Sequence, residues 1–310
     1  GPLPALAAAV ASERGMVRLS SVRAMREWSR RQRRQGRCLA VVPTMGALHR
    51  GHEALVRQAA GLADDVVVSI YVNPAQFGPG EDLERYPRSI QEDLQCLAGL
   101  DVAAAFVPEA PGLYAPDHST WVQEDALSAV LEGAWRPGHF RGVLTVVLKL
   151  FHIIEPHKAV FGLKDGQQAL LIRRMVRDLH LPVEIHLAPT VREADGLALS
   201  SRNAYLDPDE RRRAPVLYRA IRDGLARLEA GETDPEAVLR PGLERIRKTA
   251  GVALDYLDVV DLGTLRRPQQ VRDPVLLAGA VRVGSTRLID CAAHPAGGGL
   301  ISGQAGGERP

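Results

Sequence analysis

The segment from Leu39 to His52, LAVVPTMGALHRGH, constrains the fold more than any other part of the chain. Its first four residues, Leu39–Val42, are a continuous apolar run, which predicts a short strand buried in a core. Pro43 removes a backbone donor and ends the strand, and Gly46 allows the chain to turn sharply. Apolar residues recur at helical spacing after His52, so we expect a strand, a turn and then a helix.

The two histidines at this turn favour binding of a phosphate group. His49 and His52 are three positions apart, so both can face one side and donate hydrogen bonds to phosphoryl oxygens. Free N–H groups and the positive end of the helix dipole attract anions, and Gly51, without a Cβ, lets a ligand approach the backbone. Taken alone, the segment leaves two other interpretations open. One is surface or capping histidines, and the other is a zinc site, although no third ligand at metal spacing lies nearby in the sequence.

Composition narrows the partners and the compartment. The 310 residues leave room for two domains. The formal net charge of +2 gives no reason to expect a nucleic acid or a membrane surface as a partner. No run of about 18 apolar residues occurs, so we expect no transmembrane helix. Three widely spaced cysteines, Cys38, Cys96 and Cys291, argue against a disulfide framework and favour a reducing compartment, so we expect a cytoplasmic protein.

Strands and helices alternate over the first part of the chain. Further buried strands are predicted at 65–72, 102–107, 158–161 and 182–188, and helices at 22–34, 90–97, 143–154 and 169–178. This alternation is typical of an α/β fold with a parallel sheet.

After Pro208 the pattern changes. One long charged helix is predicted at 207–229 and another at 234–249, followed by strands at 254–260, 275–283 and 286–290, which together predict a smaller α+β domain. We therefore divide the chain into a flexible N-terminus (1–16), a first domain (17–189), a smaller second domain that acts as a lid (190–291) and a disordered tail (292–310).

Polar side chains follow the predicted strands, where parallel sheets bind ligands. Asn73 and Gln76 suit hydroxyl or carbonyl groups, although turn chemistry is the better interpretation for Asn73 alone. A glycine-rich loop before the next helix carries Arg136, His139 and Arg141, which suit a phosphate or a carboxylate. Solvated surface charge remains equally open for that loop.

Lys164 gives a sharper signal for a bound anion than the histidines do. It comes at a predicted helix N-terminus, where the dipole disfavours a cation, and an anion between the ammonium group and the helix would resolve this. Asp165, next to it, is a candidate N-cap. Farther along, Ser200, Ser201 and Arg202 offer two hydroxyls and a guanidinium that suit an anion, although Ser-Ser-Arg alone is common in polar loops.

Five long motifs occur in an order that resembles one family. They are residues 43–52 (PTMGALHRGH), 71–78 (YVNPAQFG), 136–142 (RPGHFRG), 161–168 (FGLKDGQQ) and 191–203 (VREADGLALSSRN). Together they closely resemble the pantoate–β-alanine ligase (pantothenate synthetase) family, from about residue 17 to residue 291. This family is part of the nucleotidylyltransferase superfamily, and two of the loops match in role the HIGH and KMSKS elements of class I aminoacyl-tRNA synthetases.

The resemblance implies a fold, a reaction and partners. The expected fold is a Rossmann-like parallel-sheet domain that binds ATP and pantoate, with a smaller α+β C-terminal domain, in a homodimer. The expected enzyme is an AMP-forming carbon–nitrogen ligase. The pantoate carboxylate attacks the α-phosphorus of ATP to give pantoyl adenylate and pyrophosphate, and the β-alanine amine then releases AMP and forms pantothenate. Mg²⁺ would accompany ATP, and no protein-only metal site is expected.

The resemblance also implies roles for individual residues. The catalytic residues would be His49, His52, Lys164, Ser200, Ser201 and Arg202, which stabilise charge on the ATP phosphates and hold the leaving pyrophosphate. The expected ATP-binding residues are these six together with Pro43, Thr44, Met45, Gly46, Gly51, Phe161, Gly162, Asp165 and Val191. Pantoate and β-alanine would contact Met45, Asn73, Gln76, Arg136, His139 and Gln168.

Some positions depart from the pattern common in the family, namely Ala75, His152, Leu163, Leu199 and Cys291. None of these departures removes a group assigned to the chemistry, so they leave open an altered affinity rather than a lost reaction. A nucleotidylyltransferase that makes a dinucleotide-type product is the first alternative, and Gln76 and Gln168 favour the ligase over it. A catalytically inert scaffold is the second, and the retention of every proposed phosphate ligand argues against it.

Overall fold

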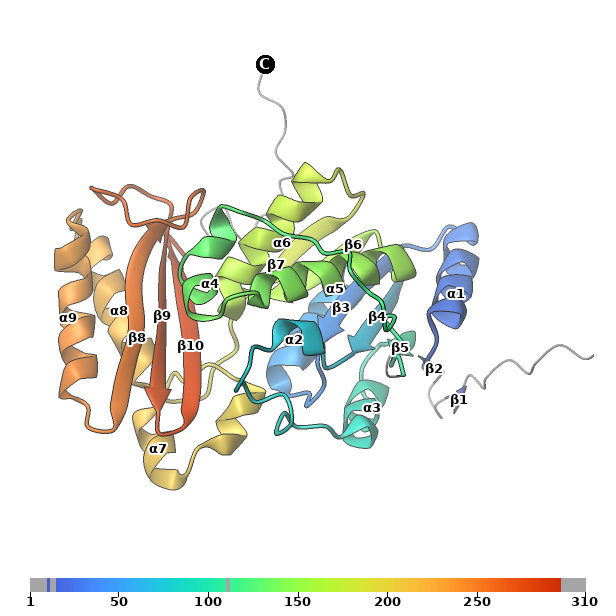
Figure 1. Cartoon of the computed structure of the whole chain (residues 1–310), viewed down its shortest axis with the longest axis horizontal. Helices are drawn as coiled ribbons and strands as arrows, with labels where there is room; N and C mark the ends of the chain where they lie inside the picture. Colours follow the sequence, from blue (N-terminus) through green and yellow to red (C-terminus); the bar gives the residue numbers. More distant parts are fainter. Residues whose placement is uncertain (1–9, 12–14, 110–111, 297–310) are drawn as a thin grey trace, which may run out of the picture.

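The computed structural model describes residues 10–11, 15–109 and 112–296 (Figure 1). Within these ranges the larger of two sheets has seven strands in the order β1-β2-β5-β4-β3-β6-β7. They are β1 (Val10–Ala11), β2 (Val17–Leu19), β3 (Leu39–Thr44), β4 (Asp65–Ile70), β5 (Ala104–Phe106), β6 (Lys158–Gly162) and β7 (Glu184–Ala188). Neighbouring strands from β2 to β7 are parallel, whereas β1 pairs antiparallel with β2. The predicted α/β fold with a parallel sheet is confirmed.

Helices cover both faces of this sheet. Along β3, Leu39 and Val41 belong to one apolar core and Ala40 and Val42 to another, because successive side chains of a strand point to opposite faces. The first core includes residues of α1 (Val22–Arg34), α5 (His139–Ile154) and α6 (Gly166–Asp178), and the second includes residues of α2 (Arg50–Ala60) and α3 (Ile90–Ala98). Strands buried on both faces are apolar at nearly every position, which is why continuous apolar runs predicted this sheet correctly. Among the described helices, none has both the length and the apolar character needed to cross a membrane.

A second, antiparallel sheet lies beside the first, in the order β10-β9-β8 (Figure 1). Its strands are β8 (Val252–Asp261), β9 (Val275–Val283) and β10 (Thr286–His294). Two helices, α8 (Val216–Glu229) and α9 (Pro235–Lys248), pack on the face turned away from the larger sheet, as the left part of Figure 1 shows. This arrangement confirms the predicted smaller α+β unit.

The single helix predicted at 207–229 was wrong. Two helices, α7 (Pro208–Arg213) and α8, occupy this stretch, and Pro215 is the N-cap residue of α8. A proline lacks the N–H group and its ring clashes with the preceding turn, so one continuous helix does not pass through Pro215.

Both ends of the described chain are more ordered than the sequence predicted. β10 continues to His294, so residues 292–294 pair with residues 275–277 of β9 and do not start a disordered tail, because β9 offers backbone partners along that whole length. At the other end, Val10–Ala11 pair with the outer edge of β2, and Met16 is buried. The rest of the segments predicted to be flexible or disordered, residues 1–9, 12–14 and 297–310, lies outside the described residues.

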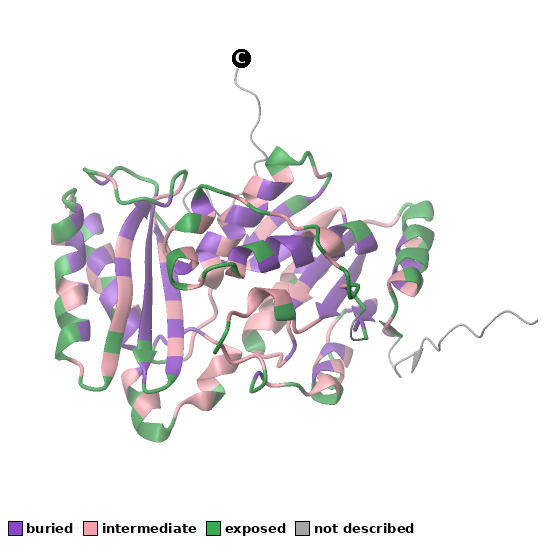
Figure 2. Cartoon of the chain, in the orientation of Figure 1, coloured by how far each residue is buried: buried purple, intermediate pink, exposed green. Residues whose placement is uncertain are grey.

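The two sheet-containing units share buried contacts. Cys291 and Ala278 of the small sheet belong to the same apolar cluster as Phe161 and Leu163 of the larger unit. Figure 2 shows buried residues running through both sheets and through α5, with exposed residues on the outer sides of α1 and α9. The predicted domain boundary between residues 189 and 190 falls just after β7 and stays a prediction.

Candidate active site

The sheet topology points to a binding crevice beside β3. This strand has β4 on one side and β6 on the other. The chain fills one half of the sheet with β4 and β5 and the other half with β6 and β7, so the direction of winding reverses between β3 and β6. Ligands of open parallel sheets bind at the carboxyl ends of the strands at such a switch point. A cavity of about 280 Å³ lies there, lined by Thr44 of β3, Gly162 of β6 and Asp290 of β10.

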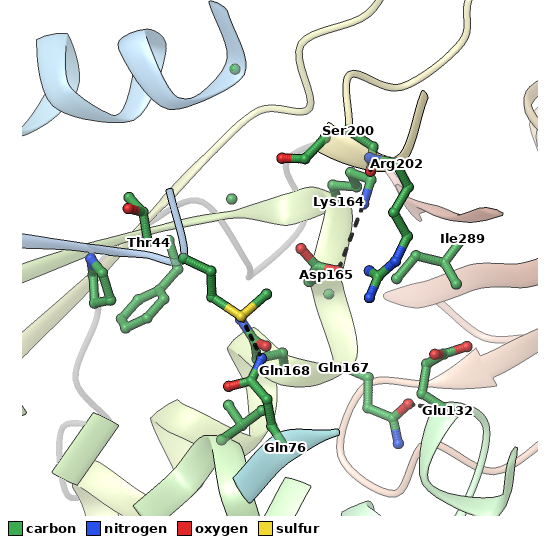
Figure 3. A pocket seen from close by; sticks show the side chains of 18 of the residues that line it. Thr44, Gln76, Glu132, Lys164, Asp165, Gln167, Gln168, Ser200, Arg202 and Ile289 are labelled. Atoms are coloured by element: carbon green, nitrogen blue, oxygen red, sulfur yellow. Dashed lines mark hydrogen bonds and ion pairs between the residues drawn. The ribbon is translucent and has the colours of Figure 1, made fainter. Parts of the chain in front are cut away.

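This cavity brings together nearly all the residues assigned from the sequence (Figure 3). Its lining includes Pro43, Thr44, Met45, His49, Gly51, His52, Asn73, Gln76, Arg136, His139, Phe161, Gly162, Lys164, Asp165, Gln168, Val191, Ser200, Ser201 and Arg202. Gly46 lies outside the lining. Its φ is +82°, and a Cβ at this position would come within 2.8 Å of Asp93 Oδ2, so Gly46 shapes the turn that follows β3.

A buried carboxylate fixes this turn. Asp93 of α3 is 3% exposed and accepts hydrogen bonds from the backbone N–H groups of Ala47, at 3.1 Å, and Leu48, at 2.7 Å. Because Gly46 has no Cβ, the carboxylate fits against the turn. Asp93 therefore holds in place the loop that carries both histidines, a role that nothing in its helical sequence context indicated.

His49 and His52 form a reciprocal cap at the start of α2. His49 Nδ1 accepts a hydrogen bond from the N–H of Gly51 at 3.1 Å, and His52 Nδ1 accepts one from the N–H of His49 at 3.3 Å. An imidazole nitrogen that accepts carries no proton, so each neutral ring keeps its proton on Nε2. Both rings line the cavity, and their Nε2–H groups are the donors left for a ligand.

This cap corrects two expectations about the turn. The N–H of Gly51 is not free for a phosphate, because His49 already binds it. Nor does the missing Cβ of Gly51 make room for a ligand, since a Cβ there would meet His49 Cε1 at 2.8 Å and Nδ1 at 2.9 Å. Gly51 instead makes room for the imidazole of His49.

Burial keeps both imidazoles neutral. The pKa of His49 is lowered to about 4, mainly by burial and then by the charge of Lys164. The pKa of His52 is lowered to about 3, by burial first and then by His49 and Lys164. Near neutral pH the two histidines therefore provide hydrogen-bond donors without positive charge.

Lys164 provides a cation close to them. It lies in η3 (Leu163–Asp165), a short turn between β6 and α6, and its Nζ is 3.9 Å from Asp165 Oδ1 (Figure 3). Asp165 occupies the N-cap position of α6, but its side chain makes no capping hydrogen bond. The predicted N-cap position is therefore correct, but the capping hydrogen bond is absent and the carboxylate lies toward Lys164 instead. Cys291 of β10 donates from Sγ to the carbonyl of Leu163 at 3.0 Å, which ties the small sheet to this turn.

The Ser-Ser-Arg loop reaches the same cavity at the start of η4 (Ser201–Tyr205). Ser201 Oγ donates to the carbonyl of Ala47 at 3.2 Å, which joins this loop to the histidine turn. Ser200 Oγ accepts from the N–H of Arg202 at 3.3 Å. The guanidinium of Arg202 donates two hydrogen bonds of 2.9 Å to Asp82. The two hydroxyls and the guanidinium therefore border one cavity with Lys164 and the histidines.

Asn73 makes its hydrogen bonds to other groups of the protein. It is 1% exposed, and it caps η1 (Pro74–Gln76) by accepting at Oδ1 from the N–H of Ala75 at 3.3 Å. Its Nδ2 donates to Gln76 Oε1 at 3.0 Å and to the carbonyl of Gly142 at 3.1 Å. The turn interpretation of Asn73 is confirmed, and the residue also orients the amide of Gln76.

Gln76 keeps a donor for a ligand. Its Nε2 lies 3.2 Å from Met45 Sδ, which is a weak acceptor. Gln168, near the start of α6, lines the same cavity as Gln76, and Figure 3 labels both side chains there. Two amides at the wall suit a small ligand with hydroxyl and carboxylate groups.

Arg136 and His139 form a hydrogen-bonded wall that leads back to Gln76. Arg136 donates from Nε and Nη2 to Glu81 at 2.8 and 2.7 Å, and its Nη1 lies 3.1 Å from His139 Nε2. Burial, and then the charge of Arg136, lowers the pKa of His139 to about 4, so the neutral ring donates from Nδ1 to the carbonyl of Gln76 at 2.8 Å. Much of the donor capacity predicted for substrate is used here. Arg141 packs over an aromatic ring and lies outside the lining.

Three acidic residues that hold the site were missed at the level of sequence, namely Glu81, Asp82 and Asp93. Glu81 and Asp82 come five and six residues after Gln76, and a pair of carboxylates so close to a ligand loop is a signal that could have found them. For Asp93 there is no such signal, because its partners are backbone N–H groups.

The described residues contain no group of three or more His, Cys, Asp and Glu side chains that could hold a metal ion. Of the carboxylates that line the cavity, Glu132 and Asp290 are each bound by an arginine, whereas the one ion pair of Asp165 within the described ranges is with Lys164 at 3.9 Å. Mg²⁺ binds through one or two carboxylates together with substrate phosphates and water. Asp165 is therefore the side chain that fits a magnesium ion carried by a nucleotide.

Comparison with known sequences identifies one family. The family profile described as Pantoate-beta-alanine ligase matches residues 18–293. The pantothenate synthetase of Moorella thermoacetica is 49% identical over 275 residues, which cover 89% of this chain and 97% of that protein.

Solved structures agree with this comparison. A crystal structure of the pantoate–β-alanine ligase (pantothenate synthetase) from Thermus thermophilus has a TM-score of 0.84 and 45% identity, covering 88% of this chain and 98% of that one. The pantoate–β-alanine ligase of Francisella tularensis, described as complexed with "Beta-gamma ATP" and β-alanine, has a TM-score of 0.74 and 33% identity, covering 90% of this chain and 97% of that one.

Proposed function

Because this chain belongs to the pantoate–β-alanine ligase family and is an enzyme of ATP-dependent pantothenate synthesis, we propose that its cavity performs both half-reactions with the residues assigned below. One observation carries the assignment. The two neutral imidazoles, the Lys164 ammonium and the Ser-Ser-Arg loop border a single cavity at the switch point of the sheet.

In the first half-reaction the pantoate carboxylate attacks the α-phosphorus of ATP, and pyrophosphate leaves. Negative charge grows on the phosphoryl oxygens, where preorganised donors stabilise it. We assign this work to Nε2–H of His49, Nε2–H of His52 and the ammonium group of Lys164. No protein nucleophile is required, because the reaction depends on positioning and electrostatic stabilisation.

The nucleotide occupies the part of the cavity between the two loops. Ser200, Ser201 and Arg202 hold the β- and γ-phosphates, which leave as pyrophosphate. The residues assigned to the adenosine and its neighbourhood are Pro43, Thr44, Met45, Phe161, Gly162, Asp165 and Val191. When magnesium is bound with ATP it neutralises phosphate charge, and Asp165 is the protein group proposed to reach it.

In the second half-reaction the β-alanine amine attacks the acyl carbon of pantoyl adenylate. A C–N bond forms, the bond from the acyl carbon to the phosphate oxygen breaks, and AMP leaves. Gln76 and Gln168 are assigned to the hydroxyl and carboxylate groups of pantoate. Arg136 and His139, at the adjoining wall, are assigned to the substrates of this step. Arg136 would contact them through the second N–H of Nη1 and of Nη2. Both ring nitrogens of His139 are already hydrogen-bonded, so His139 would act by holding Arg136 and the carbonyl of Gln76 in place.

The oligomeric state, the cellular location and the domain division are proposed from the family resemblance and from the cysteines. The family suggests a homodimer, and the free cysteines Cys38, Cys96 and Cys291 support a cytoplasmic location. Residues 17–189 and 190–291 are proposed as the two domains, with a hinge near Pro189 that brings the Ser-Ser-Arg loop onto ATP.

Product formation tests the reaction directly. We expect AMP and pantothenate from ATP only when D-pantoate and β-alanine are both present. With pantoate alone, we expect labelled pyrophosphate to exchange into ATP. Exchange that depends on an added mononucleotide instead of pantoate would point to a nucleotidylyltransferase, and no exchange with folded protein would support an inert scaffold.

A further inference from the structure

Two consecutive carboxylates each bind one cavity arginine. Glu81 binds Arg136, and Asp82 binds Arg202. All four side chains are largely buried, with Asp82 13% and Arg202 28% exposed. The two ion pairs therefore lie mostly out of solvent, where they are much less screened than surface pairs.

The two pairs use the same edge of each guanidinium. In both arginines, Nε and Nη2 donate to the carboxylate, which leaves Nη1 on the opposite edge. Nη1 of Arg136 is taken by His139 Nε2 at 3.1 Å. Nη1 of Arg202 donates no hydrogen bond to any residue in the described ranges. Arg202 can therefore keep Asp82 on one edge and bind an anion with the other.

The carboxylate of Asp82 stays charged in this setting. Burial raises the pKa of Asp82, but the hydrogen bonds and charge of Arg202 outweigh burial and hold this pKa below its ordinary value. Arg202 also lies with Cζ 5.8 Å from the ring centroid of Tyr86, so contacts on two sides restrict its long side chain. A guanidinium fixed before the ligand arrives loses less freedom on binding.

We propose that Asp82 is a positioning residue for ATP, which holds Arg202 so that its Nη1 edge faces the leaving pyrophosphate. The opposite arrangement, in which Asp82 competes with the phosphates for Arg202, would require the triphosphate to displace the carboxylate. The open Nη1 edge makes that displacement unnecessary. This inference rests on the role given to Arg202 in the proposed function.

The test compares Asp82→Asn with a matched control in pantoate-dependent exchange of pyrophosphate into ATP. We expect Asp82→Asn to raise the KM for ATP about tenfold while the KM for pantoate changes less than about twofold, since charge-assisted bidentate contacts discriminate at roughly this level. The control is Asp223→Asn, which removes an equally bidentate pair with Arg245 between α8 and α9, far from the cavity. We expect it to change neither KM.

Two further variants keep the outcome decisive. The KM for ATP of Asp82→Ser is measured in parallel. If Asp82→Asn does not fold, this value tests the positioning role in its place. In the double variant Asp82→Asn with Arg202→Ala, we expect an ATP KM no higher than with Arg202→Ala alone, because both changes remove the same contact.

The outcomes separate this inference from the proposed function. If Arg202→Ala leaves the KM for ATP unchanged, the role given to Arg202 fails, and this inference fails with it. If Arg202→Ala raises the KM for ATP but the Asp82 variants leave it unchanged or lower it, only the positioning role is overturned. If Asp82→Asn raises the KM for ATP, and the KM of Asp82→Glu lies closer to that of the wild type, the positioning role is supported.

Discussion

His49 and His52 show how one side chain can serve the fold and the chemistry together. Each ring accepts a backbone N–H at Nδ1, and this cap fixes the proton on Nε2, the nitrogen proposed to face the phosphates. The cap and phosphate interpretations of the sequence were therefore not alternatives. Depressed pKa values, about 4 and about 3, keep both rings neutral near neutral pH, and the cap then selects the tautomer.

Replacing Lys164 tests the charge of the site at a single residue. Since the histidines are neutral, Lys164→Ala removes the cation whose charge acts on both of them, and we expect adenylation to fall about 100- to 1,000-fold. Pantoate-dependent pyrophosphate exchange measures this, with thermal unfolding to show an intact fold. Lys149→Ala removes a cation that lies over the Tyr114 ring outside the cavity, and we expect it to leave exchange nearly unchanged. Near-normal exchange in Lys164→Ala would sink its assigned role.

The sequence could predict which residues meet at the cavity, but not what each one touches. Motifs with charged and polar groups after strands identified the lining, because the carboxyl ends of parallel strands meet at one edge. Gly51, Asp165 and Asp82 were misjudged or missed for a different reason. Their partners are a neighbouring ring, a neighbouring ammonium group and an arginine 120 positions away, and rotamers and distant pairing are set by packing rather than by local sequence.

At the scale of elements, α5 and η1 form one support for the substrate amide. Gly142 of α5 packs against η1 so closely that a Cβ would lie 2.2 Å from the carbonyl oxygen of Ala75. The carbonyl of Gly142 also accepts from Asn73, which orients Gln76. The position of the amide thus depends on the contact between a helix and a short turn.

Gly142→Ala should separate these two elements. We expect a loss of about 1–3 kcal/mol in the free energy of unfolding from overpacking, together with a raised KM for pantoate because Gln76 shifts. Urea unfolding and initial rates measure the two effects. Gly61→Ala, at the end of α2, places a Cβ at an ordinary 3.5 Å from its neighbours, and it serves as the control. An unchanged pantoate KM in Gly142→Ala would contradict the coupling.

Elements were predictable where one local signal dominated. Continuous apolar runs located the parallel strands, and apolar spacing located α1. The break at Pro215 was missed because charged and apolar residues continue at helical spacing on both sides of it. The strand at 292–294 was missed because small residues carry little pattern, and only pairing with β9 shows that they extend a sheet.

Over the whole molecule, a buried polar cluster joins the two units. Glu132, in α4 (Glu132–Trp135), accepts two hydrogen bonds from Arg287 of β10, at 2.7 and 2.8 Å, and one from Tyr256 of β8, at 2.9 Å. The cluster also borders the cavity. A buried carboxylate that loses its arginine is left uncompensated, so this cluster couples the stability of the fold to the contact between the units.

Arg287→Ala should destabilise the protein by about 3–5 kcal/mol, since it leaves the Glu132 carboxylate without its charged partner. Urea unfolding measures the change. Arg287 also binds Asp255, which keeps Arg282 as a partner in either variant. The double variant Arg287→Met with Glu132→Met removes the Glu132 charge as well, and we expect it to be more stable than Arg287→Ala. A double variant that is no more stable would show that the loss does not come from the unpaired Glu132 carboxylate.

Buried neutral histidines also make the stability of the molecule depend on pH. In the folded state the pKa values of His52 and His139 are lowered to about 3 and about 4, whereas unfolded histidines titrate near 6.5. Between these values each of these histidines binds more protons in the unfolded state, so its contribution to stability is greatest above pH 6.5 and falls as the pH is lowered. Each histidine contributes at most about 1.4 kcal/mol per pH unit.

The free energy of unfolding at pH 6.5 and 5.5 measures this slope, and we expect it to be smaller in His139→Gln, because one titrating group is gone. The slope is the readout, so a general loss of stability in the variant does not affect the comparison. An identical slope in the variant and the wild type would contradict a neutral buried His139.

The place of Cys291 between the two units makes its thiol a reporter of the cavity in solution. The Cys291 thiol is buried and donates to the carbonyl of Leu163, and burial first, then Asp290, raises its pKa to about 12. A thiol reagent should therefore modify it much more slowly than Cys38 and Cys96, which are partly exposed. Because Cys291 also lines the cavity, a further slowing of its reaction by ATP would report how completely the nucleotide fills the space between the two units.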